Sequence, residues 1–274
     1  MPMRTPRTPV DRRRADSETS LTSKALFRRG VSVQTRRAAA GVFFALAALF
    51  GSMQSTVVFA QSASYPAMAP LRSYLEASDT LEIALARTAA PPSISDNADI
   101  LTLDRTGYKT AIKGNNGFVC LVERSWAMGF ADPEFWNPNF RAPICNNRTA
   151  ARTVQPPYIE RTKWVLGGIT MAEMIARTRA QLSSGTFILP EAGAMSYMMS
   201  KRTRLHDADG HWHSHLMFYL ARGDAAAWGA NFKGSPLLAD SSTIFGQEDT
   251  PEPMTVFFLP VAHWSDGTPS GEVR

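Results

Sequence analysis

Three of the five histidines in the chain alternate within one short stretch of sequence. They are His211, His213 and His215, and they lead directly into the apolar residues 216–220. Imidazole is the side chain whose unperturbed pKa lies near neutrality, and it is the commonest metal ligand in proteins. The stretch is therefore the main candidate for chemistry in this sequence.

The alternation is typical of a β-strand, and we predict one over 211–220. Successive side chains of a strand point to opposite faces, so His213, His215 and Met217 share one face. Trp212 and Leu216 belong to the other face, which is the more apolar of the two. We therefore expect the second face to lie on the core and the histidine face to open to solvent or to a cleft.

Two histidines that are two residues apart on a strand lie ~6.6 Å apart and can converge on one metal ion, whereas His211 and His215 cannot without a bulge. The preferred ligand set is His213, His215 and His263, with His211 as an alternative first member. His263 is chosen because it ends a strand-like run that would neighbour the histidine strand. The lower-ranked donors are Asp209, His206 and Glu191.

Such a site would suit zinc, iron or copper. With a bound water it would support a metal-dependent hydrolase, and a redox metal would support an oxidoreductase. Two other interpretations stay open. The histidines can be solvated or hydrogen-bonded to the acidic loop 207–209. Alternatively, thioethers of Met195, Met198, Met199 and Met217 would add a preference for copper.

Prolines interrupt any regular pattern in the segment 125–155, which contains four aromatic residues between positions 130 and 140. They are Phe130, Phe135, Trp136 and Phe140. We expect a long ordered loop there, because so many aromatic rings are unusual in a solvated linker. The rings either line a ligand cleft or cover the sheet. A non-catalytic domain that binds a small ligand, or acts as a sensor, is the alternative to an enzyme.

The basic residues gather at the N-terminus. Residues 1–60 hold ten Lys and Arg against three Asp and Glu, and the rest of the chain holds 19 against 21. This distribution argues against a nucleic-acid partner. Arg36 and Arg37 precede a 13-residue apolar run, 38–50, which is short for a membrane span and typical of a signal peptide. We predict cleavage after Ala60 and a periplasmic or extracellular protein; an uncleaved anchor is the alternative.

The predicted organisation has five parts. Residues 1–30 form a disordered or untranslated leader, and 31–60 form the signal peptide. A flexible lead-in over 61–78 precedes a globular domain over 79–265, and 266–274 form a tail. The membrane would be met only through the export signal, and the oligomeric state is left open.

Cys120 and Cys145 are the only cysteines of the chain. In an oxidising compartment an even pair predicts a disulfide. A catalytic thiol at Cys120 is the less favoured alternative, since no histidine lies near it in sequence.

The elements predict an α+β fold, with a mostly antiparallel sheet and two to four helices in a single domain. Strands are expected over 108–113 and 118–123, and the Asn116-Gly117 pair between them predicts a hairpin. Thr170 and Glu173 predict a capping box at the start of a helix.

Two blocks of sequence, 116–120 and 210–213, resemble those of a family of uncharacterised exported bacterial proteins. The resemblance covers most of 80–270. It implies export and carries no known activity.

Overall fold

The computed structural model describes residues 65–207, 213–223, 225–239 and 252–271. All of them belong to one compact unit of the chain. The predicted leader, the signal peptide and the cleavage site after Ala60 lie outside the described residues.

An eight-stranded sheet forms the centre of the fold, in the order β2-β1-β3-β4-β5-β6-β8-β7. Neighbouring strands are antiparallel, apart from the parallel pair β1 and β3. The α+β class and the mostly antiparallel sheet are thus confirmed. The strands are β1 (Asp99–Asp104), β2 (Gly107–Ile112), β3 (Val119–Glu123), β4 (Ala142–Asn146), β5 (Met195–Met198), β6 (His215–Ala221), β7 (Leu238–Ala239) and β8 (Met254–Pro260).

Five α-helices occur in the described residues, slightly more than the two to four predicted. They are α1 (Asp79–Arg87), α2 (Pro92–Ser95), α3 (Arg148–Thr153), α4 (Gln155–Leu166) and α5 (Met171–Ser183). The extra ones, α2 and α3, are too short to show an apolar periodicity in sequence. The capping box of α5 is present, with Thr170 and Glu173 each bonding the other's backbone. No helix in the described ranges has the length and apolar character needed to cross a membrane.

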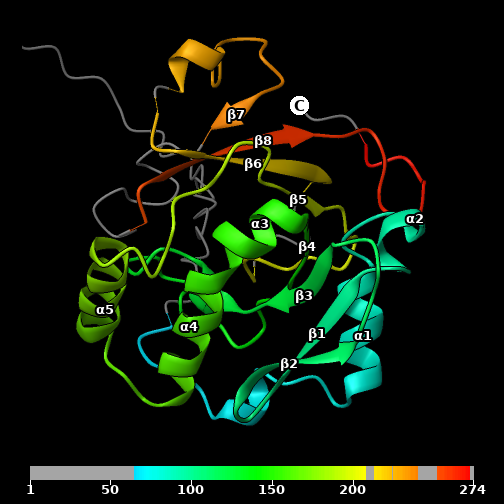
Figure 1. The fold of residues 1–274 in the computed structure, drawn as a ribbon. Coiled ribbons are helices and arrows are strands. Elements are labelled where there is room, and N and C mark those ends of the chain that lie inside the picture. Colours follow the sequence, from blue (N-terminus) through cyan, green and yellow to red (C-terminus); the bar gives the residue numbers. More distant parts are fainter. Residues whose placement is uncertain (1–64, 208–212, 224, 240–251, 272–274) are drawn as a thin grey trace, which may run out of the picture. The chain divides into compact units, whose positions relative to one another are not determined.

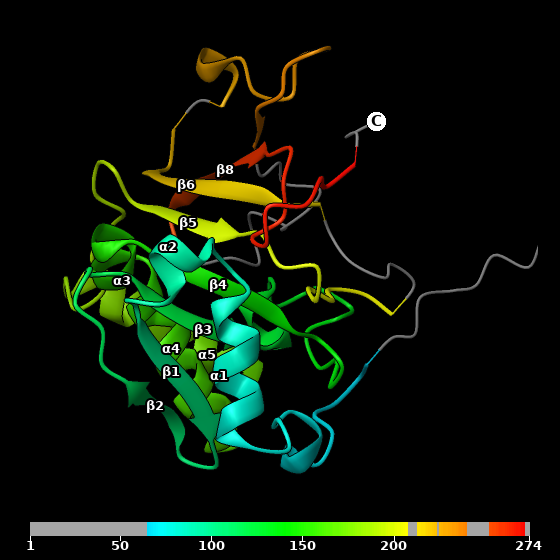
Figure 2. The same cartoon turned by 90° about the vertical axis from the view of Figure 1, so that its right-hand side faces the viewer.

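Helices cover both faces of the sheet (Figures 1 and 2). On one face α1 packs on β1, β3 and β4 through a small cluster that includes Leu85, Ile100 and Val122. On the other face α4 and α5 pack over a larger cluster that includes Leu121, Ile144 and Trp164. Consecutive residues of β3 therefore enter different clusters, as the alternation of a strand requires.

The hairpin predicted across Asn116-Gly117 is wrong. β2 turns back on β1, with Asp104 paired to Gly107, and β3 lies parallel to β1 on its other side. The segment 114–117 crosses the chain that enters β1, where the amides of Asn115 and Asn116 donate to the carbonyl of Asn97 at 2.9 and 3.3 Å. A Cβ at Gly114 would collide with the backbone of Asn97 and Ala98. These long-range contacts decide the path of the loop, and a local turn signal does not report them.

The histidine strand is shorter than predicted, because β6 begins at His215. His213 and Ser214 precede it without strand pairing, and residues 211–212 lie outside the described part of the chain. The predicted neighbour is confirmed: β8, which precedes His263, pairs with β6 over its whole length.

The predicted disulfide is present. Cys120 on β3 and Cys145 on β4 face each other in register and form a bond. The bond encloses the loop 124–141, which joins the two strands and carries the aromatic residues. Among the described residues no cysteine is free.

We predict that the double change Cys120→Ala, Cys145→Ala lowers the free energy of unfolding by about 3 kcal/mol, because the unfolded chain regains the entropy of a 25-residue loop. The melting temperature should fall by roughly 6–12 °C. Thermal unfolding followed by circular dichroism measures the change. Wild-type protein in excess reductant should melt like the variant, and equal melting temperatures of variant and oxidised wild type would contradict the prediction.

Candidate functional site

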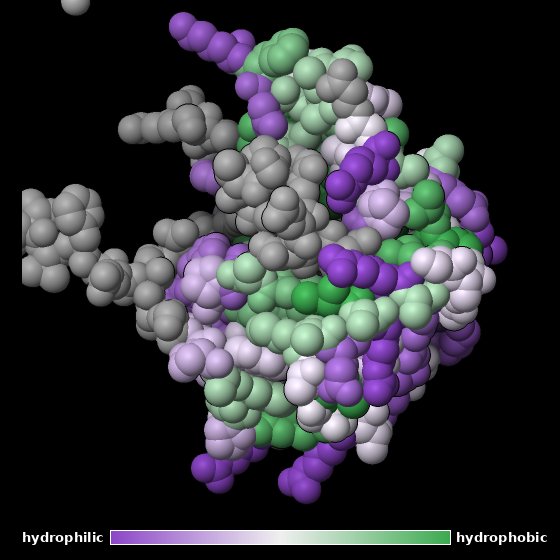
Figure 3. Space-filling view, turned by 90° about the vertical axis from the view of Figure 1, so that its left-hand side faces the viewer, coloured by the Kyte–Doolittle hydropathy of each residue, from purple (hydrophilic) through white to green (hydrophobic). Residues whose placement is uncertain are grey.

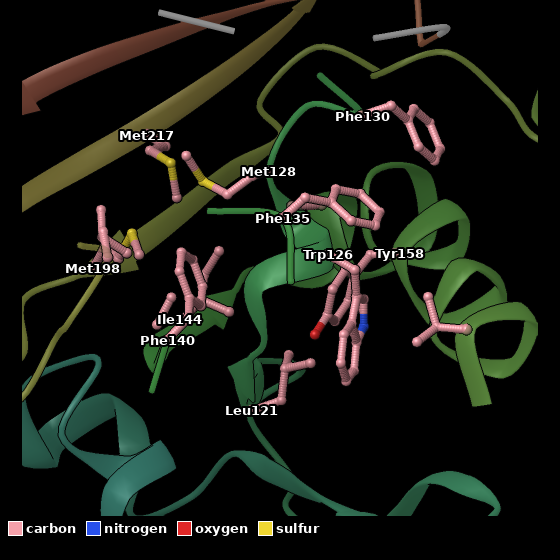
Figure 4. Packing of buried hydrophobic residues seen from close by; sticks show 14 of the residues in the cluster. Leu121, Trp126, Met128, Phe130, Phe135, Phe140, Ile144, Tyr158, Met198 and Met217 are labelled. Atoms are coloured by element: carbon pink, nitrogen blue, oxygen red, sulfur yellow. The ribbon is translucent and has the colours of Figure 1, made fainter. Parts of the chain in front are cut away.

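A cavity of about 190 Å³ lies between α4 and the face of the sheet formed by β3, β4, β5, β6 and β8. Residues of the loop 124–141 complete its wall. Most of its lining is apolar, and methionines contribute from four elements: Met128, Met198, Met217 and Met254. Figure 4 shows the buried hydrophobic cluster around the cavity, with Met217 on β6 and Met198 on β5 on one side of it and Phe140 and Ile144 nearby. The polar lining residues are Glu123, Tyr158, Arg161, His215, Tyr219, Arg222, Glu252 and Thr255.

The face of β6 that lines the cavity is the histidine face. His215, Met217 and Tyr219 are all buried, whereas Leu216 and Phe218 on the other face keep partial exposure. The expectation that the more apolar face would lie on the main core is therefore wrong. Both faces of this strand are covered, one by the cavity wall and one by a small cluster with Phe257, so side-chain polarity alone did not identify the inner face.

Glu123 ends β3 and projects its carboxyl into the cavity. Its side chain makes no hydrogen bond or ion pair with any described residue. The Glu123 side chain is partly accessible through the cavity, and its carboxyl group is surrounded by protein atoms. Desolvation therefore raises its pKa to about 7, against a smaller opposing effect of the Arg161 charge. A carboxyl that titrates near neutrality in an apolar cavity is a typical functional group.

Arg161 on α4 and Glu252 form a buried ion pair at the cavity, with Nη2 donating to Oε1 at 2.5 Å. The guanidinium also donates to the carbonyls of Trp126 and Met128, and its Cζ lies 4.5 Å from the ring centre of Phe130. Oε2 of Glu252 and Nε of Arg161 are buried without a hydrogen-bond partner among the described residues. The pair is thus held firmly but keeps one unmatched acceptor and one unmatched donor.

Arg124 follows Glu123 in the chain but serves a different carboxylate. Its Nη2 donates to Oε2 of Glu82 on α1 at 2.7 Å, and both side chains are almost fully buried. Nε donates to the carbonyl of Tyr74 at 2.6 Å. Because this guanidinium is used on the α1 side of the sheet, Glu123 gains no ion-pair partner from its neighbour.

His215 is the one described histidine that lines the cavity, and it is 2 % exposed. Its Nδ1 lies 2.7 Å from the carbonyl oxygen of His213, so this nitrogen carries the proton and donates. Burial lowers the pKa of His215, so the ring is neutral at pH 7 and Nε2 is its acceptor nitrogen. The ring also lies 5.7 Å from that of Phe258 on β8.

The other predicted metal ligands are spread over the surface. His213 and His263 are exposed, although the hydroxyl of Ser214 donates to the carbonyl of His263 at 2.6 Å and so holds the two segments together. His206 lies 4.0 Å from the buried Glu134, and Glu191 forms an exposed ion pair with Arg152. His211 and Asp209 lie outside the described residues. Within the described part of the chain, no three His, Cys, Asp or Glu side chains gather as a metal site would require.

Only one of the four aromatic residues proposed for a ligand cleft lines the cavity. Phe140 lines the cavity, whereas Phe130 and Phe135 stack on each other in the core with ring centres 5.4 Å apart. Trp136 packs edge-on against Phe135 and is only partly buried. Of the methionines considered for copper, Met198 and Met217 line the cavity, and Met195 and Met199 do not.

A smaller hollow of about 20 Å³ adjoins the cavity and shares Val154, Pro157, Glu252 and Met254 with it. Ile188 and Leu189, which follow α5 and are 40 % and 45 % exposed, also line this hollow. On the side of the molecule that carries α5, hydrophobic residues form a band across the middle (Figure 3). The shared residues connect the cavity wall to an apolar part of the surface.

Comparison of the chain with protein-family models, curated proteins and solved structures gave no match.

Sequence reasoning missed Glu123, Arg161 and Glu252, which all contribute charged groups to the cavity. The available signal was weak: Glu123 directly follows the apolar run Val119–Val122, where a buried carboxyl is rare unless paired. Nothing in the sequence places Arg161 and Glu252, 91 positions apart, in contact.

We predict that Glu123 makes stability fall with rising pH. Below pH 4.5 the carboxyl is protonated in both states. Between pH 4.5 and about 7 the unfolded chain loses this proton while the folded chain keeps it, so the free energy of unfolding falls by roughly 3 kcal/mol in that window. Glu123→Gln, whose amide does not titrate, should lack this fall.

Urea unfolding of both proteins at several pH values from 4 to 8 measures the difference between their curves. Glu160→Gln is the matched control, since Glu160 lies on α4 in an exposed pair with Lys163 and away from the cavity. Parallel curves for wild type and Glu123→Gln would show that the carboxyl has an ordinary pKa.

Proposed function

We propose that this chain is an exported protein that binds a small, mainly apolar molecule in the cavity beneath α4. The observation that supports the proposal is the cavity itself, about 190 Å³ in volume, walled by apolar side chains with a few polar groups among them. Binding sites for small molecules share this composition, in which the apolar wall provides affinity and the polar groups fix orientation. The Cys120–Cys145 bond agrees with an oxidising compartment.

The size of the cavity limits the ligand. An apolar cavity of roughly 150 Å³ holds a benzene molecule. The present cavity therefore suits one ring with a short substituent, or a branched chain of similar bulk. The elements that form the cavity wall are held in place, which supports selectivity for ligand shape. β6 and β8 are paired along their whole length, and α4 is bonded to Glu252 through Arg161.

We predict that a one-ring probe, 2-phenylethanol, binds to the purified protein, and that Ala142→Leu weakens binding at least tenfold. Ala142 lies on β4 opposite Glu123 and is 1 % exposed, so the larger side chain would occupy the cavity. Isothermal titration calorimetry measures the affinity. Ala262→Leu, an exposed change after β8, is the control. Equal binding by both variants, or no binding to wild type, would contradict the proposal.

A metal-dependent function at the histidines is a second proposal. One observation favours it: β6 pairs with β8, and Ser214 bonds to the carbonyl of His263, so the segments bearing His213, His215 and His263 are neighbours. Zinc, iron or copper would then be the cofactor. A bound water would provide the nucleophile for hydrolysis.

If the histidines bind metal, elemental analysis of untagged protein should find close to one equivalent of a transition metal. The double change His213→Ala, His263→Ala should remove it. Both side chains are exposed, so the fold should persist in the variant. Metal-free protein isolated from metal-replete cells would count against this second proposal and leave the small-molecule proposal untouched.

A further inference from the structure

The cavity has more hydrogen-bond acceptors than donors among the enclosed polar atoms that lack a partner. Oε2 of Glu252 is buried without a hydrogen-bond partner among the described residues, and the corresponding unmatched donor is Nε of Arg161. The carboxyl of Glu123 is enclosed by protein and is shifted by desolvation and the Arg161 charge, with no hydrogen bond contributing. The hydroxyl of Tyr158 is already engaged with Tyr108 and with the amide of Arg124. Among the enclosed groups of the cavity acceptors thus outnumber donors, since Arg222 is exposed to solvent, and an enclosed acceptor is expensive to leave unsatisfied.

The charges of the cavity show the same imbalance. Arg161 is neutralised by Glu252 at 2.5 Å. His215 is neutral because burial lowers its pKa. The remaining cation of the lining, Arg222, is exposed to solvent and is not among the charges that shift the pKa of Glu123. An ionised Glu123 therefore has no enclosed counter-charge of its own, which is costly in a mainly apolar site.

The side chains that share the cavity with Glu123 suit a cation with an apolar body. Phe140, Tyr158 and Tyr219 present aromatic rings, whose faces attract cations. The thioethers of Met128 and Met217 are soft and adapt to the shape of a ligand.

We infer that the ligand of the cavity carries a protonated amine, which binds the carboxylate of Glu123 while its single ring or short alkyl part lies among the methionine and aromatic side chains. The inference rests on the proposed small-molecule function and adds the chemical class of the ligand. An ammonium group brings three donors and one positive charge, which the enclosed part of the cavity lacks beyond the Arg161–Glu252 pair.

The test compares three probes of nearly equal shape on wild-type protein at pH 8: 2-phenylethylamine, 2-phenylethanol and phenylacetate. The amine should bind about 10- to 100-fold more tightly than the alcohol, as expected for a charge-assisted hydrogen bond. Glu123→Gln should remove this preference and leave the affinity for the alcohol within about threefold of wild type. Glu160→Gln should bind all three probes like wild type.

The affinity for the amine should also fall about tenfold from pH 8 to pH 6, because a carboxyl with a pKa of about 7 becomes protonated over this range. The other charged or titratable groups that share the cavity are Tyr158, Arg161, His215, Tyr219, Arg222 and Glu252. Burial raises the pKa of both tyrosines, so they stay neutral between pH 6 and 8, and it lowers the pKa of His215, which favours the neutral ring. The affinity for the alcohol should not follow the same curve.

Three results would overturn the inference. Equal affinity for amine and alcohol would remove the amine class while leaving the small-molecule function in place. Tightest binding of phenylacetate would assign recognition to Arg161 and an anionic ligand. Binding of none of the probes would reject the proposed function together with this inference.

Discussion

The pairing of buried charges constrains the rest of this structure. Two guanidinium groups serve three enclosed carboxyls: Arg124 bonds to Glu82 at 2.7 Å, Arg161 bonds to Glu252 at 2.5 Å, and Glu123 is left over. A buried charge without a partner is expensive, so the unpaired carboxyl holds its proton to about neutrality. The cavity therefore has a definite polarity at one point, although most of its wall is apolar.

The leftover carboxyl follows from strand geometry. Glu123 and Arg124 are adjacent, and a direct salt bridge between them would cancel both charges. Arg124 has an extended backbone, however, with φ −108° and ψ 170°, so the two side chains point to opposite sides of the sheet. One side carries α1 with Glu82, and the other carries α4 with the cavity. The alternation that builds the sheet thus separates the two charges, and each must find its partner on its own side.

Predictions from the sequence held where the tertiary contacts agree with the signal in the residues, and they failed where distant contacts override it. The capping box of α5 and the Cys120–Cys145 bond follow from residue types and composition, and both are present. The Asn116-Gly117 turn was misread because backbone contacts with Asn97 carry that loop across β1. The inner face of β6 was misjudged because both faces are covered. The cavity could not be predicted, since its groups come from five strands, a helix and a loop that only the tertiary fold brings together.

Burial also reverses which residue type titrates near neutrality. A histidine in water changes charge near pH 6.5 and a glutamate near 4.3, which is why the sequence draws attention to the histidines. Inside the cavity, desolvation disfavours the charged form of both groups and so moves their pKa values in opposite directions. It lowers the pKa of His215 and raises that of Glu123 to about 7. The group that changes charge at neutral pH in this cavity is therefore the carboxyl, and the buried imidazole that shares the cavity acts as a neutral hydrogen-bonding group.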